Sequence, residues 1–430
     1  DVVAIGLATS KLTAPRDVGG FRFHEFNLMR LSGREILLAL AAGVPLAAGG
    51  FLIVSVSGTL RADPAEVMRL AREGRFREAS ELGESCLANR PEDVGLRLLL
   101  AQIELDRDPP RPERALELLE NAPTSPRRFA ATWLFQRGRA RLMLARHDLA
   151  DADWNAALKL DPLVPEAAWA LLDLYDLQGR RREERVLALR CHEIEPNPAD
   201  RVRYLVTLAE RDNTPIDPAS LIPIFRPPAE AHPEYVPDGV ALASALVRDA
   251  HYDEGVDRAK LVLAANRESP EAWDGLLGVL DDAGRFGELA STVEILPPSL
   301  ADDPRFYRHR GRAAQERGDF TAAARAYEAA LEDDPSDPVV IYRLSRVLRR
   351  LGRHVEASKL ETMTKDRPKL LESLKSLVKE STRAAELSAS RRVDLYNRFA
   401  DLRDRLGRPD EARAWQRLAA ESEPMPRPAP

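Results

Sequence analysis

The stretch Tyr307–Pro335, YRHRGRAAQERGDFTAAARAYEAALEDDP, decides the fold of this chain. Its pattern predicts two short helices joined by a turn, because Gly318 interrupts the first apolar period and Pro335 ends the second. Small residues at Gly311 and Ala323 would let the two helices approach closely. One such hairpin cannot bury its apolar face alone, so it must stack on neighbouring hairpins.

Similar hairpins recur along the chain at a fixed period. Gly284, Gly318 and Gly352 are 34 residues apart, and Ala145 and Gly179 keep the same step. This spacing resembles the tetratricopeptide repeat, whose period is about 34 residues. The resemblance covers residues 63–424 and implies an all-α solenoid of helix-turn-helix units, wound as a right-handed superhelix, that binds protein partners. The residues expected at its turns and close helix contacts are Gly74, Ala79, Gly138, Ala150, Ala157, Gly179, Gly284, Gly311, Gly318, Ala323, Ala330, Gly352, Ala357, Gly407 and Ala412.

Two interruptions divide the predicted array. Residues 63–196 form a first sub-array and residues 238–368 a second. Between them, residues 197–237 are rich in proline, which we expect to forbid a long second helix, so this segment is either a distorted repeat or a break. After Pro368, an additional helix and a last hairpin occupy residues 369–423, and a Pro-rich disordered tail occupies 424–430.

An uncharged stretch, ILLALAAGVPLAAGGFLIVSV, precedes the array at residues 36–56. As a helix it would span about 31 Å, which matches the hydrocarbon core of a bilayer. We therefore expect one transmembrane helix at residues 35–57 after a flexible leader at 1–34, with a cleaved signal peptide as the alternative. Gly43, Ala47, Gly49 and Gly50 offer a small-residue surface to a second membrane helix. The expected location is the inner membrane of a bacterium, with the repeats outside the cytoplasm.

Arginines recur on predicted first helices, which in the repeat family line the concave surface. They are Arg305, Arg308, Arg312, Arg346, Arg349 and Arg350. Such a patch would bind an anionic segment, for example an acidic peptide, although in so arginine-rich a protein it could equally be a solvated surface. First helices of other repeats are acidic instead, so the groove would change sign along its length; their residues are Glu166, Asp173, Asp176, Asp274, Asp281 and Asp282.

Catalytic and cofactor motifs are not found in the sequence. The seven histidines fall in different repeats without metal-ligand spacing, and we expect them to be exposed helix or turn residues. A net charge of −6 argues against a general nucleic-acid binder. The sequence therefore predicts neither an enzyme nor a cofactor or metal protein, and its expected partners are proteins or peptides and the lipid bilayer.

Two functions of different class fit these features. In the first, the chain is a membrane-anchored scaffold that holds partner proteins during envelope assembly, secretion or complex maturation. In the second, it is a structural subunit packed permanently into a larger membrane complex. A permanent subunit should present a broad apolar surface, whereas a scaffold should present a polar groove.

Overall fold

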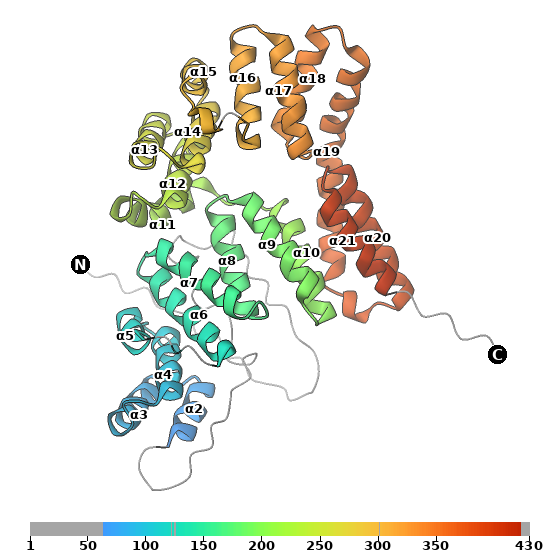
Figure 1. Cartoon of the computed structure of the whole chain (residues 1–430). Helices are drawn as coiled ribbons and strands as arrows, with labels where there is room; N and C mark the ends of the chain where they lie inside the picture. Colours follow the sequence, from blue (N-terminus) through green and yellow to red (C-terminus); the bar gives the residue numbers. More distant parts are fainter. Residues whose placement is uncertain (1–62, 122, 124–125, 301, 423–430) are drawn as a thin grey trace, which may run out of the picture.

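The computed structural model describes residues 63–121, 123, 126–300 and 302–422, and every regular element in them is a helix (Figure 1). Consecutive helices pair as antiparallel hairpins. In the first array the pairs are α2 (Pro64–Arg72) with α3 (Phe76–Asn89), α4 (Val94–Asp106) with α5 (Pro112–Leu118), α6 (Arg127–Met143) with α7 (His147–Leu160), and α8 (Pro165–Leu177) with α9 (Arg181–Ile194). In the second array they are α12 (Val236–Arg248) with α13 (Tyr252–Ala265), α14 (Pro270–Asp282) with α15 (Phe286–Glu294), α16 (Tyr307–Glu316) with α17 (Phe320–Asp333), and α18 (Pro338–Arg350) with the start of α19 (His354–Ser381).

Most turns inside these hairpins share one backbone geometry. Gly318 has φ +79°, and the amide of the next residue, Asp319, donates to the carbonyl of Ala314 at 3.0 Å. Asp319 then caps α17, since its carboxylate accepts from the amide of Ala322 at 2.9 Å. Left-handed residues end most of the other first helices too, at Gly74, Ala145, Gly179, Ala250, Gly284, Gly352 and Gly407, but the turn between α4 and α5 has none. Three of these turns, at 250, 284 and 352, keep the 34-residue register of Gly318.

Close contacts inside the hairpins depend on small residues. A Cβ added to Gly311 would lie 2.5 Å from the ring of Tyr327, and one added to Gly138 would lie 2.4 Å from Trp154. A larger side chain would therefore push the two helices apart. The alanines predicted at these contacts are buried: Ala79, Ala150, Ala157, Ala323, Ala330, Ala357 and Ala412.

The proline-rich segment contains two helices, so the expectation that prolines forbid a long second helix is wrong. α10 (Pro198–Arg211) and α11 (Pro218–Ala231) each begin with a proline, which the first helical turn tolerates. Further prolines lie inside α11, but Pro223 and Pro227 are on its exposed side, where water can satisfy the freed carbonyls. The buried side, including Phe225, packs against α12 and supplies the compensating contacts.

α10 and α11 belong to different arrays. α10 packs on α9 and on helices from the C-terminal end of the chain, whereas α11 packs on α12. The segment 197–237 is therefore a break between two arrays, with the first helix of a repeat on one side and the second helix on the other. This is the second of the two alternatives that the sequence left open.

Pro368 does not end a helix, in contrast to the boundary expected there. α19 runs without interruption through Pro368 for 28 residues. Its first half completes the hairpin with α18, and stacking stops at that point because Glu361 and Thr364 stand where the preceding repeat has the buried Tyr327 and Ala330. Residues 358–369 contain no fully buried side chain, and we call them the stalk.

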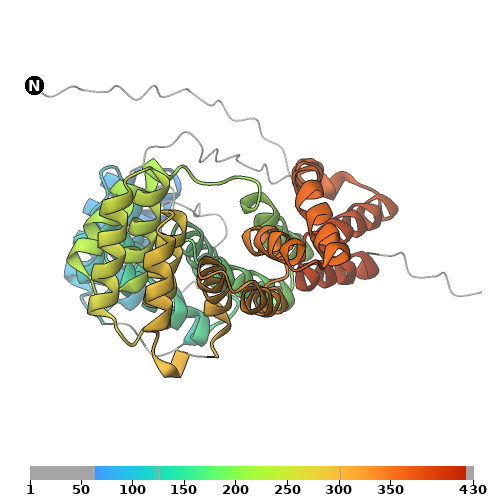
Figure 2. The same cartoon turned by 90° about the horizontal axis from the view of Figure 1, so that it is seen from above.

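The stalk leads to a unit that we call the closure block, residues 370–421. It comprises the second half of α19, α20 (Ala389–Arg405) and α21 (Pro409–Glu421), and it lies beside α10 rather than beside α18 (Figures 1 and 2). Leu205 and Ala209 of α10 pack in one core with Leu374, Phe399 and Trp415 of the closure block. The chain thus returns from the second array to cover the last helix of the first.

The predicted transmembrane helix precedes the helical arrays in the sequence. Among the helices between Asp63 and Ser422, none has the length and apolar character that a bilayer span requires. The predicted leader at 1–34, the transmembrane helix at 35–57 and the tail at 424–430 lie outside the described residues.

Candidate functional site

The first helices of the second array carry charged side chains that pair from one hairpin to the next. Arg305 lies in a short 3-10 turn (Pro304–Phe306) before α16 and pairs with Glu271 of α14, 34 residues earlier. Arg308 of α16 pairs with Asp274 of α14 at 3.2 Å, again 34 residues earlier. Because consecutive first helices are neighbours, a charge of opposite sign one period away is close enough to form an ion pair.

Asp281 at the end of α14 collects two further arginines. Arg343 of α18 donates two hydrogen bonds to its carboxylate, at 2.6 and 2.8 Å. Arg312 places its guanidinium 3.5 Å above the ring of Phe286 and 3.9 Å from Asp281. Asp281 is therefore a paired carboxylate and not part of an open acidic face, and Arg343 is a member of this network that the sequence reasoning missed.

The remaining arginines of the predicted patch all lie on α18 and differ from one another. Arg349 pairs with Glu361 of α19 at 2.8 Å. Arg346 receives no carboxylate among the described residues and donates instead to the hydroxyl of Tyr342 at 3.0 Å. Arg350 likewise has no acidic partner in the described chain and lies 4.7 Å from the centroid of Phe320. Arg346, Arg350 and the half-exposed Tyr342 are thus left to solvent on one helix, and we call them the α18 face.

Asp274 also fixes a buried histidine, so the expectation that the histidines are exposed is wrong here. His309 Nε2 lies 2.9 Å from Asp274, and the ring is buried. Burial lowers the pKa of His309. Burial alone would raise the pKa of Asp274, but Arg308 and His309 outweigh it and hold that pKa below its usual value. His147 and His192 are buried as well.

A second network joins the two arrays near the break. His147 of α7 lies 3.1 Å from Asp238 of α12, and both side chains are buried. Gln178 donates to the same carboxylate at 2.8 Å, and the hydroxyl of Tyr235 donates to Asp151 of α7 at 2.8 Å. Polar groups that are buried need hydrogen-bond partners, and these bonds supply them across the junction between the two arrays.

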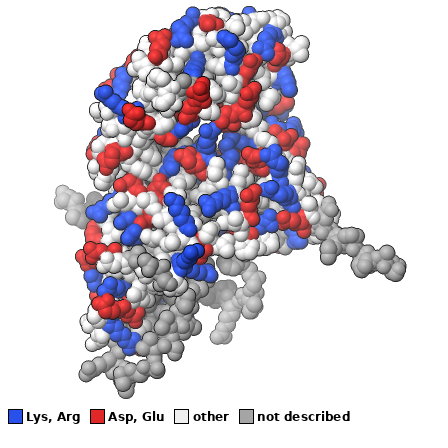
Figure 3. Space-filling model, viewed as in Figure 1, with Lys and Arg blue, Asp and Glu red and all other residues white. Residues whose placement is uncertain are grey.

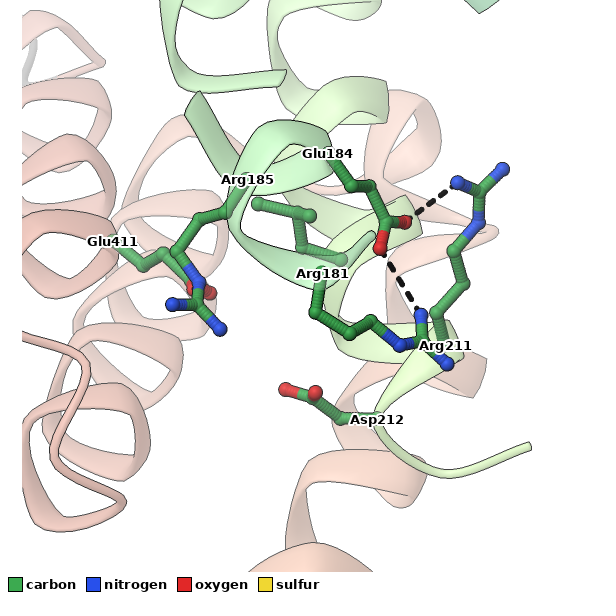
Figure 4. Close-up of a pocket in the computed structure, with 7 residues that line it drawn as sticks. Arg181, Glu184, Arg185, Arg211, Asp212 and Glu411 are labelled. Carbon is green, nitrogen blue, oxygen red and sulfur yellow. Dashed lines mark hydrogen bonds and ion pairs between the residues drawn. The ribbon is translucent and has the colours of Figure 1, made fainter. Parts of the chain in front are cut away.

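Two of the acidic residues predicted in the first array, Asp173 and Asp176, are paired in the same way. Arg211 of α10 contacts Asp173 at 2.5 Å, Asp176 at 3.4 Å and Glu184 at 2.6 Å. Arg181 also contacts Glu184, at 3.0 Å, so two guanidinium groups share this buried carboxylate (Figure 4). The predicted change of sign along the groove is therefore largely an internal ion-pair ladder.

A narrow pocket opens beside this ladder, where the closure block meets α9 and α10 (Figure 4). Its accessible volume is about 10 Å³, close to the space that one water molecule needs. Arg185 of α9 spans it to Glu411 of α21 at 3.1 Å. The pocket is too small for a metabolite and belongs to the contact that closes the chain. Its lining residues are Arg181, Glu184, Arg185, Leu208, Arg211, Asp212 and Glu411.

Charged residues of both signs are mixed over the surface seen in Figure 3. The described residues contain no group of three or more histidine, cysteine or acidic side chains that could hold a metal ion. Large exposed apolar side chains are spread over several helices, as at Val186 of α9, Leu261 of α13 and Val355 of α19. The described surface is therefore mainly polar, and the α18 face is one basic feature of it without carboxylate partners.

Comparison with known proteins gives one curated relative and several solved structures. Cellulose synthase operon protein C of Pseudomonas fluorescens (strain SBW25) is 27% identical over 178 residues, which cover 38% of this chain and 14% of that protein. The aligned part is thus a small fraction of that relative's length. The APC/C hetero-tetramer Cut9-Hcn1 matches 85% of this chain and 88% of its own at 15% identity and a TM-score of 0.30. A human IFIT1 dimer with PPP-AAAA matches 90% and 94% at 14% identity and a TM-score of 0.33.

Two family models match the sequence itself. A model described as tetratricopeptide repeat matches residues 309–362, which include α17, α18 and the start of α19. A second model with the same description matches residues 393–424, which include most of α20 and α21. Residues 309–362 and 393–424 of this chain are therefore tetratricopeptide repeats, set in an array of similar helical hairpins.

Proposed function

We propose that the chain is a non-catalytic scaffold that binds an acidic segment of a partner protein on the α18 face. The observation that carries this proposal is the difference between neighbouring arginines. Arg305, Arg308 and Arg349 already have carboxylate partners, whereas Arg346 and Arg350 have none in the described chain. An incoming carboxylate could pair with both at little cost, because no existing ion pair must be broken first.

Tyr342 of this face and its neighbour Val339 supply exposed apolar surface. Their exposed fractions are 48% and 47%, and they lie on α18 one turn apart and N-terminal to Arg346. A partner that combines acidic and apolar residues would bury this surface and pair the arginines at the same time. Such a partner would be a protein or peptide, and the acidic overall charge of the chain also favours protein over nucleic acid as the partner.

The proposed setting is the bacterial envelope. In this proposal residues 35–57 anchor the chain in the inner membrane and the repeats lie outside the cytoplasm, where they hold partners during envelope assembly, secretion or complex maturation. The similarity to a cellulose synthase operon protein suggests a polysaccharide-synthesising assembly as one such setting.

A permanent subunit of a larger complex is the second candidate, but the surface favours the scaffold. A permanent interface needs a broad apolar area, whereas the exposed apolar side chains here are dispersed over separate helices.

The test is a crosslinked pull-down of the intact protein from membranes. The Arg346→Glu variant should recover several-fold less of at least one partner, because the substitution replaces attraction by repulsion at the centre of the α18 face. The matched control is Arg325→Glu, which makes the same charge change at an exposed arginine on the second helix α17. A partner set that is unchanged by Arg346→Glu, or equally reduced by both variants, would refute binding at this face.

A further inference from the structure

The face of α10 that the closure block covers is an interface between two parts of one chain. In a regular array this face would be covered by the next helix in sequence, but α11 has moved to the other array. Leu205 and Ala209 are instead buried in one core with Leu374 and Leu377 of α19 and Trp415 of α21, and α10 contacts both of these helices. Burial of the apolar side chains on this face of α10 therefore depends on a segment about 200 residues further along the chain.

Buried charges restrict what can cover this face. Arg403 of α20 is fully buried and pairs with Asp212 at the end of α10 and, at 2.8 Å, with Glu411. Glu411 in turn pairs with Arg185 of α9 at 3.1 Å. A different helix in this place would leave the partly buried Asp212 and Arg185 without these partners, which is unfavourable. The face is thus complementary to the C-terminal hairpin of this same sequence.

Within the described residues, the stalk and a loop contact join the closure block to the second array. The stalk has no fully buried side chain, and Pro368 removes one hydrogen bond of its helix. The loop contact is between Arg408 and Asp334, at 3.1 Å. Movement of the closure block as a unit would therefore break few contacts other than those with α9 and α10.

We propose that the α10 face also accepts the closure block of a second copy of this chain, so that two copies exchange their closure blocks. Each exchanged contact would be the same as the closed one, including the Arg403–Asp212 pair. Exchange therefore conserves the interface, and only the stalk must adopt another direction. This homotypic interface is separate from the α18 face and does not depend on the function proposed for it.

Crosslinking between two tagged full-length copies tests the exchange. Arg201 of α10 pairs with Glu421 of α21 at 2.5 Å, so the two side chains mark opposite sides of the interface. One copy carries Arg201→Cys, and the other, with a different tag, carries Glu421→Cys. The two are co-expressed, and membranes are treated with a short bismaleimide. The control pairs Arg201→Cys with Ser373→Cys, an exposed residue on the free side of α19.

Exchange predicts a product carrying both tags that is several-fold more abundant for the Glu421→Cys pair than for the Ser373→Cys pair. A single chain carrying both Arg201→Cys and Glu421→Cys shows that the hairpin is folded and that the two thiols react. If that chain crosslinks internally while the two-tag product stays at the level of the Ser373→Cys control, the closure block remains in its own chain and the proposal is wrong.

Discussion

The turn between α20 and α21 offers a direct way to weaken the closed arrangement. Gly407 has φ +77°, and a Cβ added there would lie 2.6 Å from the carbonyl oxygen of Pro335 and 3.0 Å from Cα of Ser336. Both are backbone atoms, which cannot swing away as a flexible side chain could. Gly407→Ala should therefore push the closure block away from the loop between α17 and α18.

Gly352→Ala is the matched control. Gly352 has φ +76° in the equivalent turn between α18 and α19, but no atom lies within 4 Å of its added Cβ. Both alanines bear the same left-handed strain, about 1–2 kcal/mol. Only Gly407→Ala adds the steric clash, which costs about 1–3 kcal/mol more. The difference in destabilisation between the two variants therefore measures the clash where the closure block contacts the loop between α17 and α18.

Hydrogen exchange of backbone amides in α10 reports the effect locally. When the closure block detaches, the covered side of α10 opens, so exchange there should rise in Gly407→Ala by about 5- to 150-fold, the equivalent of 1–3 kcal/mol. In Gly352→Ala the exchange of α10 should stay at the wild-type level, with faster exchange confined to α18 and α19. Equal exchange of α10 in the two variants would show that the loop contact does not support the closure.

Three further predictions concern the repeats and the stalk. Ala323→Trp overfills a fully buried contact between α16 and α17 and should cost a few kcal/mol, about 1–3 or more; an unchanged melting temperature by circular dichroism would contradict the assigned packing. Pro368→Ala restores a helical hydrogen bond at an exposed position and should stabilise the chain by up to about 3 kcal/mol, whereas a lower melting temperature would show that Pro368 relieves strain. The pKa values of His309 and Asp274 are both lowered in the fold, so both groups bind protons more readily when unfolded; the melting temperature should fall as pH drops below about 6.5, where unfolded histidine titrates, and again below about 4, and a rise on acidification would refute the assignment.

The hairpins could be predicted from the sequence because their signals are local and periodic. Gly284, Gly318 and Gly352 mark turns at a 34-residue step, and the structure adds Ala250 to the same register with φ +64°. The alanine side chain hides this turn from a search for glycine. The helix in α11 was missed for a related reason, since a proline count ignores which side of a helix the prolines occupy.

The charge pairs were partly within reach of the sequence. Glu271 and Arg305, like Asp274 and Arg308, are opposite charges one repeat apart, a spacing that implies contact between neighbouring first helices. The burial of Arg403 against Asp212 could not be predicted in this way, because these residues are 191 apart and belong to no common period. Closure of the chain is a tertiary event without a local pattern, and it follows only from α10 and α11 packing in different arrays.

Covering an early helix with the last hairpin has a consequence for synthesis of the protein. Arg201 of α10 and Glu421 of α21 are 220 residues apart, so at about 5–20 residues per second the ribosome needs roughly 10–45 s between them. During that interval the nascent chain exposes the apolar side of α10 with nothing to cover it. Chains truncated before the closure block would keep that surface exposed and should aggregate or recruit chaperones, so the yield of soluble N-terminal half should depend on the closure block.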